Sequence, residues 1–361
     1  PFSRFLRGGA SGSLPKVEAR LPGVNELYSY SGDKPMFRKS FSVFFSLVSI
    51  LVSNAVLAGP YLDQPPPGDE PVLFAPDIVS TGLNDRDMAI TPDGREIYWS
   101  ANLRNFDVSV ILVARQTEDG WTDPEVAPFS RDPAYAYYEP AISPDGSRLY
   151  FVAQEAGKDA NDIWVMERMG DSWGEARKLD APISTPGKEY FPSVTKDGTL
   201  YFTKAGEDPG TEFIYRSRMV DGQFTEPERL PDQVNCGKSH FNAFIAPDES
   251  YIIVPVWGRD DSIGSIDYYV VFRNDNDQWS EPVNMGPKIN TAGGREYTPY
   301  VSPGGKYFFF MSTRSPASPD APDQGYTTAY LEHVNTQPEN GNSDIYWIDA
   351  SIIEALRPEG F

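Results

Sequence analysis

Cysteine, histidine and positive charge are all scarce in this chain of 361 residues. It has one Cys and two His, and 31 Lys and Arg stand against 52 Asp and Glu, for a formal net charge of -21 at pH 7. A single cysteine excludes an intramolecular disulfide framework and a thiolate-rich metal site. Two histidines are too few for a metal centre built on three of them. The negative charge argues against nucleic acid as a partner, because nucleic acid would be repelled.

Long hydrophobic runs are also scarce, and the one that stands out lies near the start of the chain. Residues 36–58 combine a short basic stretch, an apolar run over 41–52, and Val56 and Ala58 in the spacing of an A-x-A-like cleavage site. This layout predicts a signal peptide cleaved near Ala58, since the run is too short to cross about 30 Å of hydrocarbon. We therefore expect a periplasmic or secreted protein with no membrane span in the mature chain. Residues 1–35 are interpreted as a disordered upstream segment that is not native to it.

Five copies of one motif dominate the rest of the chain. Each has a short apolar strand, a turn of the Pro-Asp-Gly type and an aromatic-rich strand. The copies are TPDGREIYWS (91–100), SPDGSRLYFV (143–152), TKDGTLYFT (195–203), APDESYIIVPV (246–256) and SPGGKYFFFM (302–311). In such a turn, Pro presets φ, Asp caps its own backbone and Gly takes positive φ. A further strand and a second turn follow each copy, for example DIWVMER (162–168). A repeat of about 50 residues thus holds about four strands in hairpin order, as one propeller blade does.

These repeats resemble the WD40-like, TolB-type β-propeller family. The resemblance is carried by the Ser-Pro-Asp-Gly string at 143–146 together with Asp-Ile-Trp at 162–164, and it covers about residues 70–350. It implies an all-β fold. We predict a five-bladed β-propeller over residues 59–350, with six blades as the alternative, followed by a short C-terminal tail at 351–361.

The N-terminal segment is expected to close the ring. PVLFAPDIVST (71–81) matches the end of an ordinary repeat, compare KLDAPIST (178–185), whereas the fifth copy ends at DIYWID (344–349) without this outer strand. The N-terminal strand therefore completes the last blade in our prediction. Closure of this kind removes the exposed edges that would otherwise invite aggregation.

The segments that lead into the inner strands are expected to meet around one mouth of the central channel. Tight hairpin turns share the other face, so longer loops gather at this mouth, where rigid scaffolds usually carry function. Aromatic faces with converging polar groups suit sugars or extended peptides. The predicted ligand-binding residues are Arg86, Asp87, Tyr138, Glu139, Glu189, Tyr190, His240, Asn242, Arg295, Glu296 and Tyr297. Packing between blades is the alternative interpretation of the aromatic members and of His240. The long stretch 312–343 is expected on the same face, as a partial lid.

Three functions remain open at the level of sequence. The leading hypothesis is a non-catalytic, exported module that binds a protein or an oligosaccharide of the cell envelope. It is expected to be a monomer without a cofactor. The second is a glycoside-acting enzyme, because five-bladed propellers of the arabinanase and invertase type place acids around such a channel. Its candidate catalytic residues are Asp87, Glu139, Glu189 and Glu296. A retaining enzyme needs two carboxyls about 5 Å apart, and an inverting one about 6.5–9.5 Å. The third is a structural envelope component. Calcium (Ca) in the acidic channel is left open.

Overall fold

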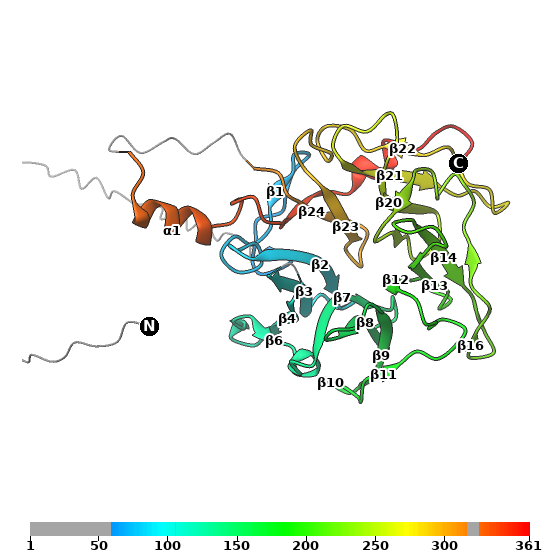
Figure 1. Cartoon of the computed structure of the whole chain (residues 1–361), viewed down its shortest axis with the longest axis horizontal. Coiled ribbons are helices and arrows are strands. Elements are labelled where there is room, and N and C mark those ends of the chain that lie inside the picture. The colour runs from blue at the N-terminus through cyan, green and yellow to red at the C-terminus, as the bar shows by residue number, and fades with distance from the viewer. Residues whose placement is uncertain (1–58, 105, 316–324) are drawn as a thin grey trace, which may run out of the picture. The chain divides into compact units, whose positions relative to one another are not determined.

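The computed structural model describes residues 59–104, 106–315 and 325–361. The signal peptide predicted at 36–58 and the upstream segment 1–35 therefore lie outside the described residues. In the described part, small antiparallel sheets stand around a central channel as five blades (Figure 1). The innermost strands contact one another in a closed ring, in the order β2, β7, β12, β19, β23 and back to β2. The all-β, five-bladed prediction is confirmed, and the six-bladed alternative is wrong for these residues.

The first three blades have the same order of strands from the channel outward. Blade 1 contains β2 (Asn84–Ile90), β3 (Glu96–Leu103), β4 (Val108–Thr117), β5 (Gly120–Trp121) and β6 (Glu125–Val126). Blade 2 contains β7 (Tyr135–Ile142), β8 (Arg148–Glu155), β9 (Asp162–Met169), β10 (Ser172–Trp173) and β11 (Arg177–Lys178). Blade 3 contains β12 (Glu189–Val194), β13 (Leu200–Ala205), β14 (Glu212–Ser217) and β17 (Glu228–Arg229), with the small hairpin β15 (Met219–Val220) and β16 (Gln223–Phe224). A short 3-10 helix, Pro128–Ser130, connects blades 1 and 2.

The last two blades include an interrupted inner strand and a strand from the N-terminal segment. Blade 4 contains β18 (Ser239–His240), β19 (Phe244–Ile245), β20 (Tyr251–Trp257), β21 (Ile266–Phe272) and β22 (Val283–Asn284). Blade 5 contains β23 (Glu296–Val301), β24 (Tyr307–Ser312), β25 (Asp344–Asp349) and β1 (Val72–Leu73). Two helices accompany them, α1 (Thr328–Thr336) and α2 (Ser351–Glu354). No helix of the described ranges is long and apolar enough to cross a membrane.

The hairpin between the first two strands of each blade follows from its turn residues. In blade 1, Asp93 Oδ1 accepts hydrogen bonds from Thr91 Oγ1 at 2.6 Å and from the backbone N–H of Arg95 at 3.0 Å. Gly94 has φ of 76°, a conformation that glycine adopts without steric cost. In blade 4, Glu249 takes the equivalent place with φ of 61°. These turns fix where each inner strand ends, and thereby hold its lead-in segment at the other face.

The N-terminal strand closes the fifth blade, as its sequence predicts. Val72 lies opposite Trp347 in the antiparallel pair of β1 and β25. Phe74 follows the strand, is fully buried, and donates its backbone N–H to the carbonyl oxygen of Ile345 at 2.8 Å. Its ring lies 5.0 Å from that of Phe309 and 5.1 Å from that of Trp347, measured between centroids. Aromatic packing and backbone hydrogen bonds thus hold the two ends of the ring together.

The C-terminal tail packs against the core of the fourth and fifth blades. Ile353 of α2 is buried in the cluster that contains Phe272 and Phe308. The guanidinium carbon of Arg357 lies 4.4 Å from the ring centroid of Phe272. The tail therefore covers the side of this cluster at the face of the tight turns.

Candidate functional site

The lead-in segments surround a cavity of about 300 Å³ at one mouth of the channel. Its lining includes residues of all five blades. The predicted residues that line it are Arg86, Tyr138, Glu139, Tyr190, Asn242 and Tyr297. The other lining residues are Phe106, Gln154, Asn161, Lys188 and Glu212. The structure thus brings six of the predicted residues together, and their binding role stays a prediction.

A local distortion of each inner strand turns these side chains toward the cavity. The pairing register shifts in the inner strands of blades 1, 2, 3 and 5. The residue at the distortion has positive φ in every blade: Asp87 59°, Glu139 57°, Phe191 50°, Asn242 22° and Thr298 53°. Positive φ is unfavourable for residues other than glycine, and it persists only where the surroundings over-determine it.

Hydrogen bonds between neighbouring blades hold these residues at positive φ. The backbone N–H of Glu139 donates to Asp87 Oδ2 at 3.3 Å, and the N–H of Phe191 donates to Glu139 Oε2 at 2.7 Å. In the same direction, the N–H of Asp87 donates to Thr298 Oγ1 at 3.3 Å. Each acceptor side chain sits in the blade before its donor. The ring of distorted residues therefore links neighbouring blades across the channel.

A buried ion cluster forms the base of the cavity. Arg86 Nε donates to Asp87 Oδ1 at 2.8 Å, and its guanidinium lies 3.5 Å from Glu139 Oε1. Asn242 Nδ2 donates to the same Glu139 oxygen at 2.8 Å. All three charged residues are buried. Their carboxylate oxygens accept hydrogen bonds within the protein, which is what buried charges require.

The cluster holds two acids and one base, so its net charge is negative when all are ionised. Burial and the nearby charge of Asp87 raise the pKa of Glu139 above its ordinary value, while Arg86 opposes this rise. Burial lowers the pKa of Arg86, but Asp87 and Glu139 together raise it above its ordinary value. Arg86 therefore remains a cation.

A third acid, Glu212, lies on the wall beside Tyr190. Burial raises the pKa of Glu212, and a hydrogen bond with Tyr190 acts against this rise. Burial and the nearby charge of Glu212 raise the pKa of Tyr190 well above its ordinary value, so this phenol stays protonated. The wall thus offers a hydroxyl and a carboxyl to a ligand.

The other predicted acids are directed away from the cavity. Glu189 accepts hydrogen bonds from the backbone N–H of Thr185 at 3.0 Å and from its hydroxyl. Glu296 Oε1 accepts from Thr291 Oγ1 at 2.9 Å. Neither residue lines the cavity, and Arg295 does not line it either. These two carboxyls fasten the lead-in loops of blades 3 and 5.

His240 does the same in blade 4, where the sequence has no acid. Its Nε2 accepts from the backbone N–H of Gly237 at 2.8 Å, and its Nδ1 donates to the carbonyl oxygen of Glu212 at 2.9 Å. Burial lowers the pKa of His240 to about 4, so the ring is neutral at pH 7. The packing interpretation of His240 therefore agrees with its contacts.

Four of the five lining residues outside the prediction lie at connections after the second strands, and the fifth, Lys188, directly precedes β12. Phe106 follows β3, Gln154 and Asn161 flank the connection of β8 and β9, and Glu212 begins β14. These connections open on the same face as the lead-in segments. This shared face was the sequence signal that could have identified their residues as part of the site. The segment 312–343 contributes no lining residue from its described part. There, Asn340 Nδ2 and Asn342 Nδ2 donate to the carbonyl oxygen of Gly82, at 3.1 and 2.9 Å.

In the described ranges, no group of three or more His, Cys, Asp or Glu side chains is placed to hold a metal ion. The sequence left calcium in the channel open, and the described ranges present no such cluster of protein ligands for it. The site offers aromatic faces, amides, hydroxyls and two acids of raised pKa.

No known protein family matches the sequence, and no curated protein sequence matches it. Solved structures of similar fold include TolB from Acinetobacter baumannii, with a TM-score of 0.43 and 16% identity over 74% of this chain. The chain covers 57% of the length of that TolB. A putative TolB from Agrobacterium tumefaciens has a TM-score of 0.43 and 15% identity, over 74% of this chain and 90% of that one. A family 117 glycoside hydrolase from Zobellia galactanivorans has a TM-score of 0.46 and 13% identity, over 81% and 93%. These similarities concern the propeller fold.

Proposed function

We propose that the protein is a non-catalytic binding module that holds a carbohydrate unit of an envelope glycan in the mouth cavity. The cavity volume of about 300 Å³ is at the lower end of ligand pockets. Tyr138, Tyr190 and Tyr297 supply rings against which a sugar can pack, and Asn242 and Glu212 supply polar groups for its hydroxyls. Placement of the protein in the periplasm or outside the cell is part of this proposal.

The observation that carries the proposal is the state of the carboxylates at the base. Asp87 and Glu139 share the guanidinium of Arg86, and their remaining oxygens accept from backbone N–H groups of the neighbouring blade. Because these internal contacts occupy their oxygens, the two acids stabilise the shape of the cavity. The polar groups left for a ligand are those of the wall, which suit recognition of hydroxyls.

A glycoside-acting enzyme is the second candidate, favoured by one observation. Burial and the charge of Asp87 raise the pKa of Glu139, and a raised pKa is what a carboxyl needs to act as a general acid. Glu212 would be the second acid of such a site, since Glu189 and Glu296 are directed elsewhere. Catalysis requires Glu139 to give up its internal hydrogen bonds to reach a glycosidic oxygen.

Thermal melting of the purified protein against a panel of oligosaccharides tests the proposal. A saturable rise in Tm means that the folded state binds the sugar. Glu212→Gln should remove most of this rise, whereas Glu207→Gln, an exposed acid of the preceding loop, should keep it. Equal shifts in both variants, or no shift with any sugar, would contradict a glycan site at the mouth.

Incubation with the sugar that binds separates the two candidates. New reducing ends would identify an enzyme, and Glu139→Gln should then abolish cleavage while binding persists. An intact sugar after long incubation supports the binding module.

A further inference from the structure

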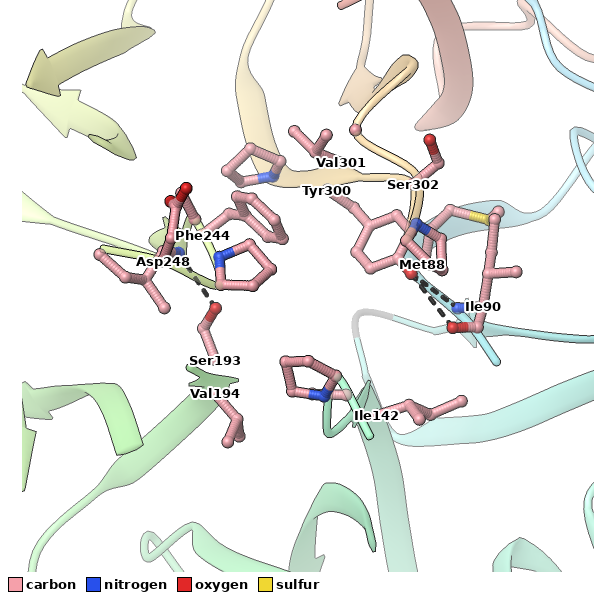
Figure 2. A pocket seen from close by; sticks show the side chains of 18 of the residues that line it. Met88, Ile90, Ile142, Ser193, Val194, Phe244, Asp248, Tyr300, Val301 and Ser302 are labelled. Carbon is pink, nitrogen blue, oxygen red and sulfur yellow. Dashed lines mark hydrogen bonds between the residues drawn. The ribbon is translucent and has the colours of Figure 1, made fainter. Parts of the chain in front are cut away.

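A second and larger cavity, of about 440 Å³, lies at the opposite end of the channel. It opens on the face of the Pro-Asp-Gly turns, where the sequence analysis expected no function. Apolar side chains from the inner strands line it (Figure 2). They include Met88, Ile90, Ile142, Val194, Phe244 and Tyr300.

The backbone of each inner strand also faces this cavity, because one edge of the strand is not paired. In blade 2, the N–H of Ser143 donates to the carbonyl oxygen of Arg148 at 2.9 Å. The next pair along the strands, Ile142 opposite Leu149, is therefore of the kind that exchanges no hydrogen bonds. The N–H of Ile142 points away from β8 and toward the channel.

The equivalent N–H meets a side chain of the preceding blade in two places. The N–H of Ile90 donates to the hydroxyl of Tyr300 at 3.0 Å, and the N–H of Ile245 donates to Ser193 Oγ at 3.0 Å. Figure 2 shows both contacts at the wall of the cavity. The acceptor residue occupies the same position in both blades, directly before the last residue of the inner strand.

The other three blades have no acceptor at that position. The pairs of acceptor position and donor are Ala89 with Ile142, Ala141 with Val194, and Phe244 with Val301. Alanine and phenylalanine side chains cannot accept a hydrogen bond. Three N–H groups are therefore presented to a cavity whose side chains are largely apolar, and a polar group in such a place needs a partner.

We propose that this turn-face cavity is a second binding site, for a small apolar molecule whose acceptor oxygens bond the N–H groups of Ile142, Val194 and Val301. The volume lies within the range of small-molecule sites, which typically combine apolar walls with a few backbone donors. A plain hydrocarbon chain is a poor occupant, because it would cover the donors without accepting from them. The site is separate from the mouth cavity and stands independently of the glycan proposal.

Two fluorescent probes with the same rings test this assignment. 1-Anilinonaphthalene-8-sulfonate carries acceptor oxygens, and N-phenyl-1-naphthylamine lacks them. The native protein should bind one sulfonate probe with saturation. Ala141→Ser places a hydroxyl where Ser193 has one in the next blade, so it should accept from the N–H of Val194. This variant should bind the sulfonate probe with roughly two- to tenfold lower affinity, and its affinity for the other probe should be unchanged.

Ser193→Ala is the matched opposite change, since it frees the N–H of Ile245. It should strengthen binding of the sulfonate probe by a similar factor. Both substitutions are small, and circular dichroism and Tm will show that the variants are folded. Equal affinities of the three proteins for the sulfonate probe would overturn the proposal.

Two further variants locate the probe. Lys196 lines the cavity and could hold a sulfonate by charge alone. If Lys196→Met lowers the affinity for the sulfonate probe and Ala141→Ser does not, the role of the N–H donors is overturned. Glu212→Gln alters the mouth cavity, and a change of probe affinity in this variant would place the probe there instead. Unchanged affinity in Glu212→Gln supports the turn-face site.

Discussion

Buried carboxyls occupy the first or second residue of β2, β12 and β23, and each accepts from a threonine shortly before it. Asp85 Oδ2 accepts from the N–H of Thr81 at 2.8 Å and from its hydroxyl at 2.6 Å. Its Oδ1 is buried without a hydrogen-bond partner among the described residues, as is Asp344 Oδ1. Burial raises the pKa of Asp85 to about 7, despite these bonds.

Asp85→Asn should flatten the dependence of stability on pH. A carboxyl with a raised folded-state pKa contributes stability below its unfolded pKa of about 3.9, and this contribution is lost as pH rises through about 7. The native protein should thus lose stability between pH 5 and pH 8, on the order of 1–3 kcal/mol from this group. The variant should lose less, as Tm measured across this range will show. Asp69→Asn, at an exposed position, should keep the native slope, and identical slopes of all three proteins would contradict the assignment.

Arg86→Met should be strongly destabilising, because it leaves Asp87 and Glu139 buried without their cation. Loss of one partner of a buried ion pair costs about 3–5 kcal/mol. Urea unfolding should show this cost in the free energy of unfolding. Arg104→Met is the control, since its side chain is 77% exposed and its change should stay within about 0.5 kcal/mol. A similar small effect at Arg86 would mean that the cluster does not support the mouth.

At the scale of elements, the inner strands show which features of the site the sequence could predict and which it could not. Aligned lead-in segments predicted that Arg86, Tyr138 and Tyr190 meet at one mouth, and the structure brings them together. Strict alternation of side chains along a strand fails at the distorted residue, where positive φ turns the chain. Glu189 and Glu296 lie just before this point, so the alignment could not separate the acids that fasten loops from those that line the cavity.

The closing strand gives a prediction at this scale. Phe74→Ala removes a fully buried ring from its contacts with Phe309 and Trp347, and should lower the free energy of unfolding by about 3–5 kcal/mol. Val72→Ala, two residues earlier and 43% exposed, should cost much less, under about 1 kcal/mol. Chemical denaturation of both variants measures this difference. Equal costs would show that the closing strand adds little to the ring.

For the whole molecule, the regular turns allowed the number of blades to be predicted, because each of the five turns of the Pro-Asp-Gly type marks the end of one inner strand. The cavity at the turn face could not be predicted from the sequence in the same way. Its existence depends on small side chains such as Ala141, which leave the channel unfilled and the backbone N–H groups uncovered. Such gaps follow from the sizes of residues that come together only after the ring has closed.

Net charge gives the prediction for the molecule as a whole. At -21, the acidic groups repel one another, and this repulsion opposes the compact state. Raising NaCl from about 10 to about 150 mM shortens the screening length to about 8 Å and should raise Tm by a few degrees. Calorimetry at constant pH measures the shift. A fall in Tm would mean that local ion pairs, which salt also weakens, outweigh the overall repulsion.

Closure by the N-terminal strand also sets an order of events during synthesis. Ser80 hydrogen-bonds the backbone of Ile345, which is 265 residues further along the chain. β1 must therefore stay unpaired until β25 has been made. Each doubling of a loop adds only about 0.6 kcal/mol to its closure, so the delay is a matter of time more than of free energy. During that interval, β1 and the edge of the last blade are open to other chains, and a binding factor that shields them would act before β25 is made.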